Sequence, residues 1–278
     1  LPNGKKMSFL KTPKILEKGK AHYGCDSFEG LPLEYNGGPG TAGAHWAKKY
    51  MNTDYMIGDS YGENLISDLT LALFEDSGWY KVDFNLSNLF LWGKNKGCNF
   101  FDINKKCIRE EDGKIISDFN PEFCTNINYP ICSTSNVFRG NCKVRKYQSP
   151  LLAYERYFND TQMGGVDPLT DKCPIPVEER NKQAYYGGSC RVGTDNNISK
   201  QEKICPECAC FMSNLREAKA TKSFLRQEEA YKVEMPRGPF IKIDLPKLTD
   251  DDLKASCYQF KCEENELFVY VNDKRYKC

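Results

Sequence analysis

Histidine is scarce in this chain: its 278 residues include two histidines, His22 and His45. A catalytic zinc site with three histidine ligands therefore cannot be assembled from this chain alone. Charge of one sign is lacking as well, because 39 basic and 38 acidic residues leave a formal charge of +1, and no basic run exceeds a few residues. We therefore expect no nucleic-acid partner.

Long apolar runs are also missing. The longest mainly apolar run, Leu65 to Phe74, contains Ser67 and Asp68, so it is too short and too polar to span a bilayer, and we expect no transmembrane segment. Heptads and internal repeats are absent. The content of 40% hydrophobic, 13% aromatic and 28% charged residues is nevertheless typical of a globular chain. It excludes a disordered protein, and the length suits about two domains.

Cysteine, by contrast, is abundant. Thirteen of the 14 cysteines follow residue 97, and an even number with irregular spacing is typical of disulfides formed in an oxidising compartment. Three sequons for N-glycosylation, at Asn85, Asn159 and Asn197, point the same way. We therefore predict a glycoprotein of the secretory pathway, either extracellular or at the cell surface.

The chain opens with LPNGKK, without an initiator methionine or the apolar region of a signal peptide. A secreted protein needs a targeting signal. We therefore expect these residues to be a fragment or a processed product of a longer protein.

Two helices are predicted near the start of the chain. Thr12 and Pro13 form a helix start signal, and Gly24 ends that segment. A second helix is predicted over 64–78, where Gly78 is a natural stop. Its apolar face follows a period of 3.6 residues and consists of Ile66, Leu69, Thr70, Leu73 and Ser77, widened by Leu65, Ala72 and Phe74.

Strands are predicted over 79–84, directly after the second helix, and over 241–245 and 267–271. The segment 214–230 is ambiguous between helix and loop. From Cys98 onward, glycine, proline and cysteine interrupt short aromatic and β-branched runs. This shift predicts one domain over 1–100 and a β-rich domain stapled by disulfides over 101–278.

Three further features allow more than one interpretation. Cys205-Pro-Glu-Cys208-Ala-Cys210 resembles a zinc knuckle or a redox CxxC, but no second CxxC or neighbouring histidine completes a four-ligand set, so we expect disulfides. The loop GGPGTAGA lacks the Lys-Ser/Thr of a phosphate loop. His22 lies late in the first predicted helix. A favourable interaction of its side chain with the helix C-terminus explains a histidine at this position without a role in metal binding.

The most informative segment is GTAGAHWAKKYMNTDYMIGDSYG, residues 40–62. A lone histidine is more often structural than a ligand, but small, flexible residues precede His45 and let the backbone pass close to another group. Met56 follows eleven residues later in a tight, polar stretch. A methionine at a packed turn also commonly fills a core. A histidine followed by a methionine-bearing turn is, however, the arrangement of the metzincin zinc peptidases.

Residues 12–83 resemble the segment of the leishmanolysin family that follows its catalytic helix. GTAGAHW is similar to the family's third zinc-ligand motif, with His45 in the ligand position, and Met56 falls on its Met-turn methionine. LTLALFEDSGWYK resembles the family's helix and strand after that turn. CFMSNL and SCYQFKC are similar to pieces of its cysteine-rich C-terminal domain.

The resemblance implies an α+β fold: the C-terminal part of a metzincin catalytic unit over 1–100, mixed helix and loop with the Met-turn, followed by the β-rich domain stapled by disulfides over 101–278. It implies a zinc metalloendopeptidase that acts on polypeptide substrates. His45 would be a zinc ligand, and Met56 would form an apolar floor beneath the metal.

The sequence departs from the family in two respects. It contains no HExxH, the family's source of two zinc-binding histidines and the general-base glutamate, and Ala47 stands where the family often has an acidic residue. We therefore expect the isolated chain to contain no catalytic residue and to be inactive without the missing N-terminal catalytic part. The alternative is a catalytically dead, disulfide-rich surface or adhesion protein on the same fold, but the intact GTAGAHW and Met56 favour the enzyme.

Overall fold

The computed structural model describes residues 6–59, 64–102, 104–127, 129–178, 188–192, 202–213, 254–264, 266–271 and 274–277. The chain divides into two compact units. Unit 1 contains residues 1–129 and 141–177, and unit 2 contains residues 130–140 and 178–278.

Unit 1 contains every helix of the described residues. The α-helices are α1 (Pro13–Tyr23), α2 (Lys48–Met51) and α3 (Asp68–Asp76), and the 3-10 helices are η1 (Phe84–Leu86), η2 (Cys98–Phe101) and η3 (Ala153–Glu155). Its antiparallel strand pairs are β1 (Phe9–Leu10) with β2 (Leu31–Pro32), β3 (Arg109–Glu111) with β4 (Lys114–Ile116), and β7 (Val144–Lys146) with β8 (Met163–Gly165). Within the described residues, no helix is long and apolar enough to cross a membrane.

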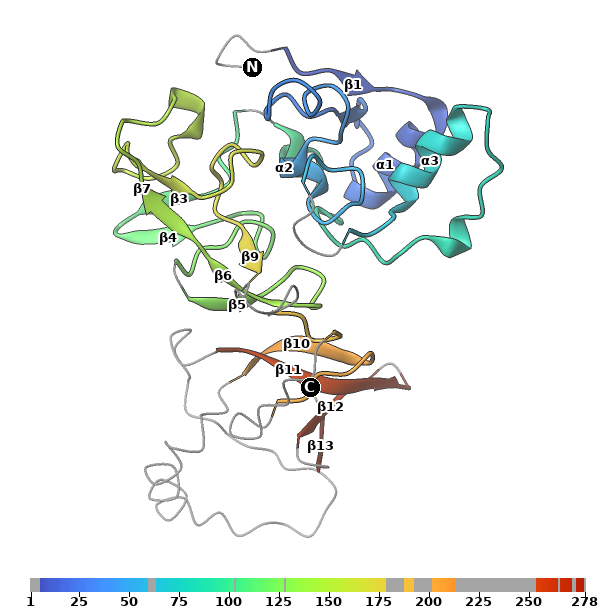
Figure 1. The fold of residues 1–278 in the computed structure, drawn as a ribbon, viewed down its shortest axis with the longest axis vertical. Helices are drawn as coiled ribbons and strands as arrows, with labels where there is room; N and C mark the ends of the chain where they lie inside the picture. Colours follow the sequence, from blue (N-terminus) through green and yellow to red (C-terminus); the bar gives the residue numbers. More distant parts are fainter. Residues whose placement is uncertain are drawn as a thin grey trace. The chain divides into compact units, whose positions relative to one another are not determined.

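Unit 2 is built on an antiparallel sheet with the strand order β10 (Cys208–Ser213), β11 (Lys254–Glu263), β12 (Glu266–Val271) and β13 (Lys274–Lys277), drawn in orange and red in Figure 1. A sheet of β5 (Pro130–Cys132), β6 (Arg139–Cys142) and β9 (Pro176–Glu178) contains the boundaries of the units, which fall within β6 and β9. β12 confirms the strand predicted over 267–271, whereas the predictions for 241–245 and 214–230 lie outside the described residues. Together, the helices and small antiparallel sheets confirm the predicted α+β class.

The first predicted helix is confirmed at both ends. α1 begins at Pro13, after Thr12, whose backbone is extended but whose side chain makes no cap hydrogen bond. The Asp76 carboxylate accepts the Lys14 and Ile15 N–H groups instead, at 2.9 and 3.1 Å. Proline suits the first helical position because its fixed φ is already helical and its missing N–H would have no partner there. The helix ends at Gly24, which has a φ of 65° and donates its N–H to the Lys20 carbonyl at 3.0 Å. Glycine reaches this left-handed conformation without the clash that a Cβ would cause.

The second predicted helix is shorter than the apolar pattern indicated. α3 begins after Ser67, whose Oγ accepts a backbone hydrogen bond from the first turn at 3.2 Å, so residues 64–67 precede the helix. Serine is a strong N-cap because its side chain satisfies an N–H that has no partner within the helix. Gly78 follows the helix with a φ of 71°, as expected. The buried face is narrower than predicted, since Ile66 and Phe74 are 41% and 37% exposed.

The strand predicted over 79–84 is wrong. No strand of the described residues includes this segment, and η1 begins at Phe84. The Asp83 carboxylate accepts the Asn85 N–H at 3.0 Å and starts that turn, while Trp79 is 85% exposed. A β-prone sequence forms a strand only where a neighbouring strand pairs with it, and none of the described residues does so here.

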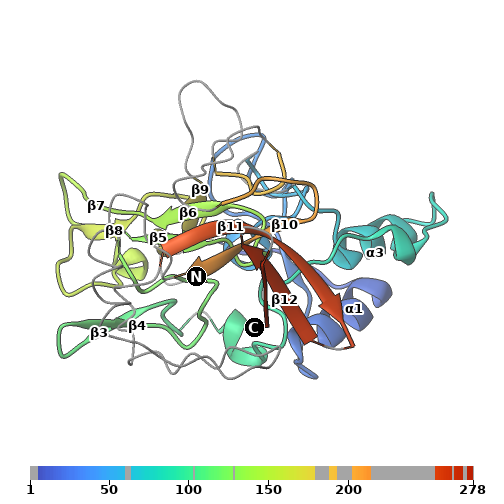
Figure 2. The same ribbon diagram turned by 90° about the horizontal axis from the view of Figure 1, so that it is seen from below.

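Aromatic rings fill the core of unit 1, against which α1 packs. Figures 1 and 2 both show α1 and α3 side by side. The Tyr23 ring stacks on Phe28 at a centroid distance of 5.6 Å and meets Phe101 edge to face at 4.5 Å. A Cβ added at Gly19 would lie 2.1 Å from the Phe28 ring. The close approach of α1 to this ring therefore depends on glycine.

Six disulfides confirm the predicted use of cysteine. Unit 1 contains Cys25–Cys98, Cys107–Cys173 and Cys124–Cys142, and unit 2 contains Cys132–Cys210, Cys190–Cys257 and Cys205–Cys208. The cluster over 205–210 is thus disulfide-bonded, as predicted. Cys262 is free and exposed, and Cys278 lies outside the described residues. This disulfide content fits an oxidising compartment.

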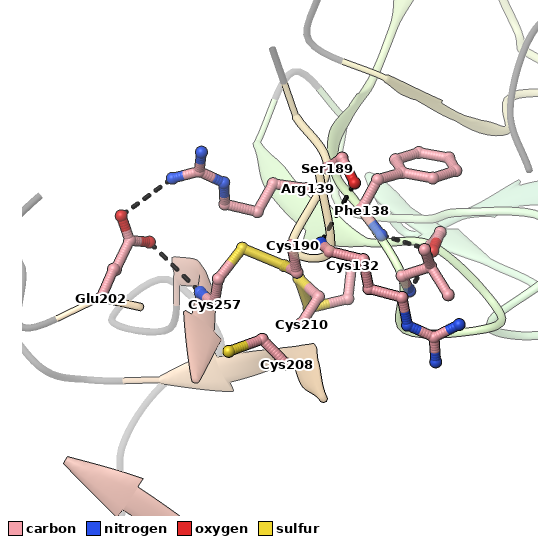
Figure 3. Close-up of a disulfide and its surroundings, with 12 residues drawn as sticks. Cys132, Phe138, Arg139, Ser189, Cys190, Glu202, Cys208, Cys210 and Cys257 are labelled. Carbon is pink, nitrogen blue, oxygen red and sulfur yellow. Dashed lines mark hydrogen bonds and ion pairs between the residues drawn. A yellow bond between two sulfur atoms is a disulfide. The ribbon is translucent and has the colours of Figure 1, made fainter. Parts of the chain in front are cut away.

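Disulfides and one ion pair fasten the first two strands of the unit 2 sheet. Cys210 and Cys257 lie opposite each other on β10 and β11, and each is bonded to a cysteine on a separate segment. Figure 3 shows the Glu202 carboxylate beside them, where it accepts hydrogen bonds from Arg139 Nη1 at 2.8 Å and from the Cys257 N–H at 3.3 Å. The Glu202 side chain is 2% exposed, so the ion pair is shielded from solvent.

We predict that Gly19→Ala lowers the free energy of unfolding although alanine is the better helix former. Helix propensity alone would raise stability by about 1 kcal/mol, but the clash with the packed Phe28 ring costs roughly 1–3 kcal/mol. Urea unfolding followed by fluorescence measures the difference. Lys20→Ala, at the exposed next position, is the control and should be nearly neutral. A Gly19→Ala variant as stable as the wild type would contradict the predicted clash.

Candidate functional site

His45 lies on a segment that is held between two others. Its carbonyl accepts the Glu34 N–H at 2.8 Å, and the N–H of the next residue, Trp46, donates to the Met56 carbonyl at 2.9 Å. Trp46 also forms single β-bridges with Leu33 on one side and with Ile57 on the other. These backbone contacts fix the position of the His45 Cα relative to the Met56 turn.

The His45 imidazole has a defined orientation. Its Nδ1 lies 3.2 Å from the Met56 carbonyl oxygen. A carbonyl can only accept a hydrogen bond, so Nδ1 is the nitrogen that carries the hydrogen. This leaves a lone pair on Nε2, with which no described residue forms a hydrogen bond, on a side chain that is partly exposed. Metal-binding histidines are typically oriented in this way, with the far nitrogen bonded to a carbonyl or a carboxylate.

Met56 contributes to the site through both its backbone and its side chain. Its carbonyl accepts hydrogen bonds from His45 Nδ1 and from the Trp46 N–H. Its side chain is partly buried and packs against the core of unit 1. The structure thus brings the two residues of the sequence motif together, while the ligand role of His45 and the floor role of Met56 stay predictions.

A buried carboxylate, Asp54, fastens the Met56 turn to α3. Asp54 has 0% exposure, and its oxygens accept hydrogen bonds from the Met56 N–H at 2.8 Å, from Ser67 Oγ at 2.5 Å and from Thr70 Oγ1 at 2.8 Å. Thr70 Oγ1 in turn accepts from Trp46 Nε1 at 2.9 Å. Burial raises the pKa of the Asp54 carboxyl, and the hydrogen bonds that it accepts oppose that rise. No pattern in the sequence indicates that Asp54 is buried. Thr70, a polar residue on the apolar face of the predicted helix, did indicate that a buried polar partner lies nearby.

Glu34 plays a similar part on the other side of the His45 segment. Its carboxylate accepts the N–H groups of Tyr35, Asn36 and Lys48 at 3.0, 2.9 and 3.0 Å. Burial raises the pKa of Glu34, and these backbone hydrogen bonds oppose the rise. The Lys48 N–H belongs to the first residue of α2, whose N-cap residue, Ala47, has no side-chain oxygen. Glu34 therefore accepts the first N–H of α2, for which the N-cap residue supplies no side-chain acceptor.

The buried ammonium group of Lys48 links the segment that follows Met56 to Asp167, which lies elsewhere in unit 1. Lys48 is 2% exposed, and its Nζ lies 2.5 Å from a carboxylate oxygen of Asp59 and 2.5 Å from one of Asp167. A buried ammonium is tolerated only where it is paired and hydrogen-bonded. These ion pairs therefore hold the chain that follows Met56 in place.

Two glycines of the loop before His45 serve its backbone conformation, while the predicted close approach of this backbone to another group stays a prediction. A Cβ added at Gly40 or Gly43 would meet nothing within 4 Å in the described part of the chain, so no close approach requires glycine there. Both residues have positive φ values, 89° and 79°, which glycine adopts without strain. The backbone conformation of the loop therefore requires glycine at these two positions.

His22 contrasts with His45. Its Nε2 donates to the Trp92 carbonyl at 2.9 Å, and its ring stacks on Phe90. Burial lowers the pKa of His22, which favours the neutral imidazole over the cation that a helix C-terminus attracts. The predicted explanation by the helix C-terminus is therefore replaced by this hydrogen bond.

The remaining site predictions concern glycosylation and metal clusters. Asn85 and Asn159 are exposed, and Asn197 lies outside the described residues. A glycan needs an exposed asparagine, and the three glycosylation sites stay predictions. Within the described ranges, no group of three or more His, Cys, Asp or Glu side chains could hold a metal ion.

We predict that Asp54→Ala lowers the free energy of unfolding by roughly 3 kcal/mol, because it leaves the N–H of Met56 and two buried hydroxyls without an acceptor. Chemical denaturation measures the loss. Asp68→Ala is the control, since Asp68 lies in the first turn of α3 and, among the described residues, its side chain forms one long ion pair at 3.8 Å. Its expected cost is below about 1 kcal/mol. Equal losses in the two variants would contradict the role assigned to Asp54.

Folding stability should depend on His22 at mildly acidic pH. Because its pKa in the folded state lies below the ordinary value of 6.5, protonation favours unfolding, and stability should fall as the pH drops from 6.5 through the folded-state pKa. His22→Gln should remove this part of the decline, as measured by urea unfolding at a series of pH values. The same slope in both proteins would show that His22 is not buried in its neutral form.

Several known proteins are similar to this chain in sequence. The sequence profile of the peptidase M8 family, described as leishmanolysin, matches residues 3–236. The chain is 32% identical over 186 residues to leishmanolysin from Leishmania tropica, an alignment that covers 66% of this chain and 26% of that protein. It is 34% identical over 182 residues to leishmanolysin from Leishmania donovani, covering 65% of this chain and 29% of that protein.

A longer alignment includes nearly all of the chain. It joins the chain to a leishmanolysin-like peptidase from Drosophila pseudoobscura pseudoobscura at 26% identity over 295 residues, covering 99% of this chain and 40% of that protein. The chain thus spans between 26% and 40% of the length of these relatives. Because the family profile covers most of the 278 residues, His45 and Met56 included, the chain belongs to the leishmanolysin family of zinc metallopeptidases.

Proposed function

We propose that this chain supplies the third zinc ligand, His45, and the Met-turn of a leishmanolysin-like zinc metalloendopeptidase. The observation that supports this most is the hydrogen bond from His45 Nδ1 to the Met56 carbonyl, because it leaves the Nε2 lone pair available. A neutral imidazole nitrogen oriented in this way is a donor that zinc prefers. One imidazole cannot hold the metal, so two further histidines and the glutamate of an HExxH helix would come from outside these 278 residues.

The chain's own contribution is to position the ligand. A zinc ion held by three histidines supplies a Lewis acid and lowers the pKa of a bound water. The Met56 carbonyl orients the His45 ring, and Asp54 keeps the Met56 turn in place by accepting its N–H. The Met56 side chain, which packs against the core of unit 1, would form the apolar floor beneath the metal. The substrate would be a polypeptide in an extended conformation.

We also propose an extracellular or cell-surface location. Six disulfides are stable in an oxidising compartment. The predicted glycosylation sites Asn85 and Asn159 are exposed, which a glycan requires. Mass measurement of the secreted protein before and after enzymatic removal of N-glycans would test the proposed glycosylation.

We predict that the 278-residue chain binds zinc weakly and has no peptidase activity on its own. The longer protein that carries HExxH should cleave peptides, lose activity on chelation and regain it with zinc. A peptide-cleavage assay on both proteins, with metal removed and restored, checks this. Cleavage by the 278-residue chain that a chelator abolishes would overturn the proposal, and an inactive longer protein with HExxH intact would favour the catalytically dead adhesion protein.

In the longer protein, His45→Ala should lower kcat/KM by more than about 100-fold, because two imidazoles hold zinc loosely. Met56→Leu should be milder, since leucine keeps an apolar side chain of similar volume. His22→Gln is the matched control, because it removes the other histidine, which is bonded to Trp92. Bound zinc, measured after dialysis, should fall only in His45→Ala. Full zinc content in that variant would remove the ligand assignment.

A further inference from the structure

Unit 1 contains a pocket of about 250 Å³ that shares no residue with the His45–Met56 site. Its walls come from segments far apart in the sequence, around residues 35, 50, 105 and 155 and at residue 171. The volume is several times the roughly 30 Å³ that one water molecule takes up. It therefore suits a ligand larger than a bare inorganic ion and smaller than most drug-sized molecules.

Positive charge dominates the lining of this pocket. Four cationic side chains, Lys49, Lys105, Lys106 and Arg156, face a single carboxylate, Asp171. The whole chain has a formal charge of +1, so an excess of three positive charges here is a local feature. Several cations around one concave surface attract anions and raise their local concentration.

The one carboxylate is already engaged by the protein. Asp171 is 4% exposed, and it accepts hydrogen bonds from the Tyr35 hydroxyl, from Asn36 Nδ2 at 3.0 Å and from Lys49 Nζ at 3.3 Å. Asp171 therefore balances Lys49 and holds the Tyr35 wall. It is not available to a cationic ligand, which leaves the remaining cations to define the ligand's charge.

The remaining cations can reach a ligand. Lys105, Lys106 and Arg156 are exposed, and no described residue pairs with either ammonium group. Arg156 donates its Nε to the Leu151 carbonyl at 2.7 Å, which fixes the plane of the guanidinium. Its terminal nitrogens stay available for the two-pronged contacts that carboxylates and phosphates accept.

Two tyrosines supply an apolar wall and two hydroxyls. Tyr50 and Tyr157 are 2% and 4% exposed and line the pocket. Neither hydroxyl has a hydrogen-bond partner among the described residues. Burial raises the pKa of both phenols, and the nearby Asp171 raises it further, so they stay protonated donors. A protonated phenol hydroxyl at the wall of a pocket can donate a hydrogen bond to an acceptor group of a ligand.

We propose that this pocket binds a small organic anion: one oxyanion group, a phosphate or a carboxylate, on a flat apolar body about the size of a benzene ring. Lys105, Lys106 and Arg156 contact the oxyanion, and the tyrosine rings pack against the body. The free energy of binding comes from both parts, so neither an inorganic ion nor a neutral ring should suffice.

Calorimetric titration of the 278-residue chain tests this with four probes: phenyl phosphate, benzoate, inorganic phosphate and phenol. At least one of the first two should bind saturably and at least tenfold more tightly than inorganic phosphate and phenol. Which of the two binds more tightly identifies phosphate or carboxylate as the preferred oxyanion. Saturable binding of neither aromatic anion, or equal binding of inorganic phosphate, would overturn the proposal.

Charge variants separate a built site from general attraction. The triple variant Lys105→Gln, Lys106→Gln, Arg156→Gln should weaken binding of the tighter aromatic anion at least tenfold. Its matched control, Lys20→Gln, Lys81→Gln, Lys143→Gln, removes the same charge at exposed positions outside the pocket and should change affinity less than twofold. Equal weakening in both would show non-specific attraction and contradict the site. Thermal unfolding of each variant confirms that it is folded.

Discussion

The carboxylate of Asp54 is the constraint on which the His45 region depends. Buried at the centre of unit 1, it accepts hydrogen bonds from the Met56 turn and from the start of α3, and Thr70 extends the network to Trp46. A buried carboxylate is costly unless its oxygens are satisfied, so these partners cannot move apart independently. The residue beside Trp46 is His45, whose ring is oriented by the Met56 carbonyl. The fold therefore presents one imidazole in a fixed position and a single tautomer.

Local signals in the sequence predicted some elements well and others not at all. The bounds of α1 follow from Pro13 and Gly24, because their backbone preferences are local, whereas the carboxylate that caps its first turn belongs to the distant Asp76. The strand predicted over 79–84 failed because a strand also needs a partner, which periodicity does not reveal. The start of α3 was misplaced since Ser67 outweighs the apolar residues before it.

The sequence predicted the two residues of the site motif, but not the buried carboxylates that hold their backbone in place. His45 and Met56 stand out through a resemblance of consecutive motifs, whereas Asp54 and Glu34 are single acidic residues whose burial depends on distant partners. The disulfide pairing was inaccessible for the same reason, because it joins cysteines up to 78 residues apart. The residues that line the cationic pocket come from segments far apart in the sequence, so no local sequence pattern predicts the pocket.

The central claim, that the fold prepares His45 Nε2 as a metal donor, is tested most directly by the tautomers of the two histidines. Long-range proton–nitrogen NMR spectra of the 278-residue chain, recorded well above the ordinary histidine pKa, distinguish protonated from unprotonated imidazole nitrogens. We predict opposite tautomers: Nδ1–H in His45, donating to Met56, and Nε2–H in His22, donating to Trp92. Assignment follows from the His22→Gln spectrum. A His45 ring with its hydrogen on Nε2 would contradict the account, because the nitrogen proposed to bind zinc would then have no lone pair to offer.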